Sequence, residues 1–97
     1  MTAKVHSTIP SGEALTIQQV EILRHMLGAQ THIKKRKWGF RNYFNAENGH
    51  DDEPILIQLL KMDLVVRGRP GYWHCTVAGC VAAGLTPAQI RRAIHGD

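Results

Sequence analysis

One stretch of the chain, from Asp51 to Ala82, constrains the fold more than any other. It opens with acidic residues ahead of leucines at helical spacing, which predicts a helix. A short aliphatic run follows, and a turn rich in glycine and arginine leads into aromatic and β-branched residues, which predicts a β-hairpin. Thr76 then lies where it can cap a further short helix. In order, these patterns predict a helix near 52–62, strands near 64–67 and 72–76, and a helix near 77–83.

Several residues of this stretch also occur at a characteristic spacing. Leucines occupy the predicted helix, an aliphatic pair and an arginine occupy the first strand, and a threonine and a glycine follow the second strand. These positions are Leu56, Leu59, Leu64, Val65, Arg67, Cys75, Thr76 and Gly79. Together they resemble the signature of winged helix-turn-helix proteins, including MarR-type repressors, over about a third of the chain. Two positions depart from the family pattern, since Asp63 replaces a usual glycine and Cys75 replaces a usual leucine.

The resemblance implies a mainly α fold with a small β-hairpin, which is an α+β, winged helix-turn-helix-like single domain. A chain of 97 residues is long enough for one hydrophobic core and too short for a second unit. Residues 1–14 lack an apolar period, so we expect a flexible N-terminal segment there and the winged-helix domain over 15–97. A looser likeness, to small phage and prophage proteins, includes Arg41, Asn42, Tyr43, Phe44 and Gly49.

Helix signals flank the central stretch on both sides. Thr16 and Gln19 have the spacing of a capping box and precede an apolar face at helical spacing. Thr86 and Gln89 repeat this pattern near the other end of the chain. MarR-type proteins pair through terminal helices, so the resemblance also implies a homodimer as one arrangement. The predicted helices cover 16–28 and 87–95.

Between the first helix and the central stretch, residues 29–48 interleave basic and aromatic side chains. We expect a short helix to begin near Thr31 and to break at Gly39. The aromatic residues have two interpretations, core packing or stacking on nucleotide bases, and the first is the more common role. They are Trp38, Tyr43 and Phe44.

Binding of double-stranded DNA is the leading hypothesis for function. The formal net charge is +4, which favours polyanionic partners. Lysine and arginine neutralise phosphates, and asparagine can read an adenine edge. In winged folds the hairpin tip contacts DNA, so the resemblance adds two arginines near the turn. The candidate residues are Lys34, Lys35, Arg36, Lys37, Arg41 and Asn42 from the basic segment, and Arg67 and Arg69 from the hairpin.

An acidic cluster near the start of the 52–62 helix has two interpretations. Carboxylates there can cap the helix and favour its dipole. In the winged-helix family, however, the recognition helix would start near Asp51, where acids repel DNA phosphates. The alternative function is therefore a protein-interaction module, such as a phage-encoded inhibitor of a host nucleic-acid-binding or defence complex. Its partner-binding residues would be Glu47, Asp51, Asp52 and Glu53.

The sequence gives little support to catalysis, metal binding or a membrane partner. Histidines and cysteines lack CxxC and HxxxH spacing, and adjacent His74 and Cys75 would point to opposite faces of a strand. We expect no enzyme activity, no cofactor and no metal site, with both cysteines as reduced core thiols. No apolar run approaches the roughly 20 residues that cross a bilayer, so the expected location is the cytoplasm of a bacterial host cell. The side chains weighed as ligands are His32, His50, His74, Cys75 and Cys80.

Overall fold

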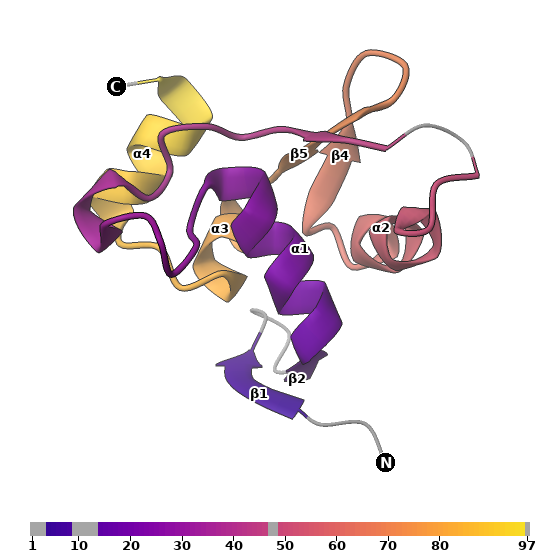
Figure 1. Cartoon of the computed structure of the whole chain (residues 1–97), viewed down its shortest axis with the longest axis horizontal. Helices are drawn as coiled ribbons and strands as arrows, with labels where there is room; N and C mark the ends of the chain where they lie inside the picture. Colours follow the sequence, from indigo (N-terminus) through magenta and orange to yellow (C-terminus); the bar gives the residue numbers. More distant parts are fainter. Residues whose placement is uncertain (1–3, 9–13, 47–48, 97) are drawn as a thin grey trace.

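The computed structural model describes residues 4–8, 14–46 and 49–96, which form an α+β arrangement of four α-helices and a small antiparallel sheet (Figure 1). The helices are α1 (Ile17–Leu27), α2 (Glu53–Lys61), α3 (Val77–Ala82) and α4 (Pro87–His95), with one 3-10 turn, η1 (Lys35–Lys37). The strands are β1 (Lys4–Thr8), β2 (Ala14–Thr16), β3 (Phe44–Asn45), β4 (Val65–Arg67) and β5 (Tyr72–Cys75). The sheet has the order β3–β5–β4, and β1 pairs with β2. In these ranges no helix is both long enough and apolar enough to cross a membrane.

Local capping signals define α1 and α4, as the sequence predicts. At α1 the Thr16 hydroxyl oxygen accepts a hydrogen bond from Gln19 N at 3.1 Å, and Gln19 Oε1 accepts one from Thr16 N at 2.9 Å. The same reciprocal pair joins Thr86 and Gln89 at the start of α4. Each pair satisfies backbone groups that a helix start otherwise leaves free. Both predicted helices are confirmed.

The predicted helix, hairpin and second helix also form, each with ends within one residue of the expected range. Asp63 links α2 to β4 with a φ of 60°, a left-handed conformation that aspartate tolerates better than most residues. Its carbonyl oxygen accepts a hydrogen bond from the Thr76 hydroxyl at 2.8 Å, which ties the start of the hairpin to its end. Thr76 also caps α3 by accepting from Gly79 N, as predicted. An aspartate is therefore compatible with this position.

The three-stranded sheet has a core face and an outer face, because side chains alternate along each strand. Trp73 and Cys75 of β5 are buried on the core face. Tyr72 and His74 are partly exposed on the outer face. Pairing of β3 with β5 places Phe44 opposite Trp73, and therefore on the core face.

Helix α1 lies at the centre of the hydrophobic core and packs against α2, α3 and β5 (Figure 1). Its Val20, Leu23, Met26 and Leu27 are almost fully buried. Burial of each such side chain contributes on the order of 1.5–3 kcal/mol to folding. The other elements contribute Leu56, Leu59, Leu64, Val65, Trp73, Cys75 and Cys80.

Two segments differ from the sequence prediction. No α-helix begins near Thr31 in the described residues 29–46, where the cations form the 3-10 turn η1 instead. The reason is that like charges three residues apart, Lys34 and Lys37, and the lack of an apolar face do not stabilise a longer helix. Gly39 does interrupt regular structure as predicted, with a φ of 87°. In the N-terminal segment, where the sequence predicts no regular structure, Lys4–Thr8 forms β1.

Candidate nucleic-acid interface

Residues 34–37, three lysines and an arginine around η1, form a surface that we call the basic turn. Their side chains are exposed, while their backbone is held against α4. Gln89 Nε2 donates a hydrogen bond to the Lys35 carbonyl oxygen, and Arg92 Nη1 donates to the Arg36 carbonyl oxygen at 2.9 Å. The basic turn therefore presents four positive side chains on a backbone that α4 holds in place.

In the part of the chain that the structure describes, no carboxylate lies close enough to neutralise the basic turn. Among the described residues, the acidic and basic side chains that lie within 4 Å of each other are Asp52 and His50, with Oδ2 and Nδ1 3.9 Å apart, and these form an ion pair only when the histidine is protonated. Figure 1 places the basic turn beside α4, across α1 from α2 and the acidic residues at its start. Helix α1 thus separates the side that carries the basic turn from the side that carries the acidic residues before α2, and a polyanion is attracted to the former.

Residues 38–46, called the strap below, connect the basic turn to the hairpin and run across one end of α1 (Figure 1). Gly39 N and Tyr43 N donate to carbonyl oxygens of the last turn of α1, at 2.9 and 3.0 Å. The strap then forms β3 and pairs with β5. The sequence does not indicate β3, since a strand of two residues has no periodicity of its own.

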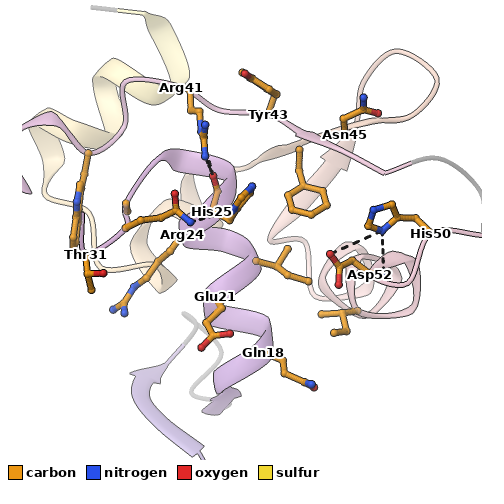
Figure 2. A pocket seen from close by; sticks show the side chains of 16 residues that line it. Gln18, Glu21, Arg24, His25, Thr31, Arg41, Tyr43, Asn45, His50 and Asp52 are labelled. Carbon is orange, nitrogen blue, oxygen red and sulfur yellow. Dashed lines mark hydrogen bonds and ion pairs between the residues drawn. The ribbon is translucent and has the colours of Figure 1, made fainter. Parts of the chain in front are cut away.

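Arg41 joins the strap to the C-terminal end of α1. Its Nε and Nη2 donate to the His25 carbonyl oxygen at 3.2 and 2.7 Å (Figure 2). The same oxygen also accepts a hydrogen bond from Gly28 N at 3.3 Å, so Arg41 adds to the bonds that close the end of α1. The guanidinium Cζ also lies 5.5 Å from the Phe40 ring centroid and 5.8 Å from that of Tyr43. Arg41 is therefore a positioned cation, and its Nη1 group remains as a donor for a phosphate.

Asn42 has a structural role that the sequence prediction does not include. Its Oδ1 accepts a hydrogen bond from Cys75 N at 2.7 Å, and its Nδ2 donates to the Cys75 carbonyl oxygen at 3.0 Å. His74 Nδ1 donates to the Asn42 carbonyl oxygen at 2.6 Å, because a carbonyl can only accept. The side chain thus takes the place of a neighbouring strand at the end of β5. Since its amide is engaged in this way, we withdraw Asn42 from the predicted interface.

Asn42→Ala is expected to lower the free energy of unfolding by about 2–3 kcal/mol, because Cys75 N and O lose their partners at the buried end of β5. Denaturant unfolding followed by tryptophan fluorescence measures the change. Asn45→Ala is the matched control, since Asn45 is exposed in β3 and its loss should cost less than about 0.5 kcal/mol. Equal stability of the two variants would contradict the role assigned to Asn42.

The two hairpin arginines lie on opposite faces of the sheet. Arg67 pairs in register with Trp73, and its Cζ is 4.3 Å from the Trp73 ring centroid, so it covers the core face. Arg69 lies in the turn, with its Cζ 4.7 Å from the Tyr72 ring centroid on the outer face. The winged-helix resemblance assigns both arginines to the hairpin tip that contacts DNA, whereas the structure places them on different faces of the sheet.

The aromatic residues of the strap divide between the core and the surface. Trp38 and Phe44 pack against the core, as predicted. Tyr43 is 49% exposed, so its assignment to the core is wrong, and Phe40 is 53% exposed. Tyr43 lies beside Tyr72 of β5, with ring centroids 6.3 Å apart. This contact joins the strap to the outer face of the hairpin.

The acidic residues at the start of α2 fit the capping interpretation only in part, since Glu53 lies in the first turn but Asp52 makes no side-chain cap. Asp52 is the N-cap, but its side chain makes no capping hydrogen bond, because its backbone is helical, with φ −88° and ψ −5°. A capping side chain reaches the free amides from an extended backbone. Glu53 accepts a hydrogen bond from Gly49 N at 3.3 Å, and Asp51 is exposed. Glu47 lies outside the described residues.

A groove of about 1020 Å³ lies along α1, between the strap and the start of α2 (Figure 2). Glu21 and His25 line it from α1, and His50 and Asp52 line it from the loop before α2. The Phe44 ring lies between the two histidines, with its centroid 5.3 Å from His25 and 6.3 Å from His50. The groove carries charges of both signs, so it does not favour a polyanion. The sequence does not indicate it, because its walls come from separate segments.

The two cysteines are thiols of the hydrophobic core. Cys75 and Cys80 are free and buried, as predicted. A hydrogen bond with the Cys80 side chain, and then burial, raise the pKa of the Cys75 thiol well above its usual value, so it is a poor nucleophile at neutral pH. Across residues 4–8, 14–46 and 49–96, no group of three or more histidine, cysteine or acidic side chains is placed to hold a metal ion.

Comparison with known proteins does not identify a relative. No family model matches the chain, and no similar protein is found among curated proteins or among solved structures.

Proposed function

We propose that the protein is a small, non-enzymatic, phage-type DNA-binding protein of the winged-helix type, with transcriptional regulation as its role. The basic turn, Arg41 and Arg69 contact phosphates of the duplex. The order of α2, the β4–β5 hairpin and α3 agrees with the winged-helix resemblance. The basic turn and the strap occupy the segment where a helix-turn-helix protein needs its second helix, so they take over contacts with the DNA backbone.

The main support for this proposal is the basic turn. Its four cations are exposed, lack a carboxylate within 4 Å among the described residues, and project from a backbone fixed by Gln89 and Arg92. A fixed cluster of positive charge neutralises several phosphates at once and releases their counterions. The acidic start of α2 lies across α1 from this cluster (Figure 1), so it does not oppose the approach of DNA from the basic side.

Fluorescence anisotropy with a labelled random-sequence duplex tests the proposal. The logarithm of the affinity should fall linearly with the logarithm of the salt concentration, with a slope of about −0.9 for each phosphate contacted. Micromolar binding with a slope steeper than about −3 is the expected result, because the basic turn alone offers four cations. Absence of binding at low salt would overturn the proposal.

A protein-interaction module is the second candidate, and the acidic residues favour it. Asp52 does not cap α2 through its side chain and Asp51 is exposed, so helix capping does not account for these charges. If duplex binding is absent, the acidic side of the molecule is the surface to test. Charge reversal of Asp51, Asp52 and Glu53 should then abolish binding to a basic protein surface and leave folding intact.

A further inference from the structure

The outer face of the three-stranded sheet carries exposed aromatic side chains. Tyr43 is 49% exposed, Asn45 is exposed and Tyr72 is partly exposed. Figure 2 shows Tyr43 and Asn45, which also line the rim of the groove, extending from the strap away from α1. An isolated exposed aromatic residue is common, but here two rings lie together on one face.

Each of the two tyrosines, called the tyrosine pair below, has a guanidinium group close to its ring. The Tyr43 and Tyr72 ring centroids are 6.3 Å apart, with the ring planes inclined by 58°. The Arg69 Cζ is 4.7 Å from the Tyr72 centroid, and the Arg41 Cζ is 5.8 Å from the Tyr43 centroid. The surface therefore combines two aromatic rings with two positive charges.

The backbone on which the tyrosine pair is mounted is held by hydrogen bonds. Tyr43 N donates to the Met26 carbonyl oxygen at 3.0 Å, and Tyr72 belongs to β5, the central strand of the sheet. The Arg41 bonds to the His25 carbonyl oxygen fix one of the two cations. Rings that are held in place in the free protein lose little conformational freedom when a ligand binds.

We propose that the tyrosine pair is a stacking platform for unpaired bases, so that single-stranded nucleic acid binds to the outer face of the sheet. Aromatic side chains on a sheet stack with bases whose faces are accessible, and nearby cations attract the phosphates between those bases. Bases inside a duplex are already stacked and present only their edges. This inference rests on the proposed function, because the basic turn supplies the attraction for phosphates along the same strap.

Anisotropy with a labelled oligothymidine and a duplex of equal length, at one salt concentration, tests the platform. Tyr43→Ala should weaken binding of the single strand by about fivefold to a hundredfold and leave duplex binding unchanged. The Tyr43 side chain is half exposed and its N–H bond is made by the backbone, so this variant should fold. Tyr43→Phe is the matched control, since it keeps the ring and should bind the single strand like the wild type.

The outcomes separate this inference from the proposed function. Duplex binding that depends on salt, with no effect of Tyr43→Ala on the single strand, would overturn the platform and leave the proposed function in place. Equal losses for Tyr43→Ala and Tyr43→Phe would also overturn it, because a hydroxyl contact would then replace stacking. Failure of the wild type to bind either nucleic acid would overturn both. Loss confined to Tyr43→Ala and to the single strand supports stacking.

Discussion

Replacing all four cations of the basic turn with alanine is expected to weaken duplex binding on the order of a hundredfold at moderate salt. Each phosphate contact that is lost should also make the slope of log affinity against log salt shallower by about 0.9. The reason is that residues 34–37 are exposed and carry no carboxylate partner in the described ranges, so their charge is available to DNA. Fluorescence anisotropy across a salt series measures both the affinity and the slope.

The variant should fold normally, because α4 holds the basic turn through backbone carbonyl oxygens rather than through the four side chains. The substitutions lower the formal net charge from +4 to zero, so a control for overall charge is needed. The control compares two single variants, Lys37→Ala in the basic turn and Lys61→Ala on α2. Both lysines are exposed and both changes remove one positive charge, but Lys61 lies across α1 from the basic turn. Similar losses for these two single variants would show that net charge, and not this surface, determines binding.

Most of the helices and the hairpin follow from local sequence signals. The Thr16 and Gln19 capping box involves residues three positions apart, so its geometry needs no distant partner. The turn before Tyr72 and the aliphatic run after Asp63 define the hairpin in the same way. These elements form within one residue of their expected ends because neighbouring residues determine them.

The candidate site depends on contacts between residues that are distant in sequence. Local sequence patterns do not predict most of these contacts. Tyr43 contacts Tyr72 only because β3 pairs with β5, and β3 is too short, at two residues, to be recognised in the sequence. Asn42 completes β5 through its side chain, a role that no spacing in the sequence indicates. The side chain of Asp52 makes no capping bond for a local reason, since the residue adopts a helical rather than an extended backbone.

Gly79→Ala is expected to reduce the free energy of unfolding by about 2–3 kcal/mol, although alanine favours helices. A Cβ at this position would overlap the Leu64 carbonyl oxygen and lie 3.1 Å from its carbon. That carbonyl cannot easily move, because it accepts a hydrogen bond from Thr76 N at 3.0 Å. The gain in helix propensity is at most about 1 kcal/mol, so the steric cost prevails. Glycine at this signature position therefore allows α3 to approach β4 closely.

Thermal and denaturant unfolding measure this effect, which should lower the melting temperature by about 4–8 °C for each kcal/mol lost in a domain of this size. Val81→Ala is the matched control, because it removes methyl groups from the same short helix at a position that is 48% exposed. The control should change stability by less than about 0.5 kcal/mol. A Gly79→Ala variant as stable as the wild type would mean that α3 can shift away from β4. The close approach of α3 to the Leu64 carbonyl oxygen would then not be a rigid feature of the fold.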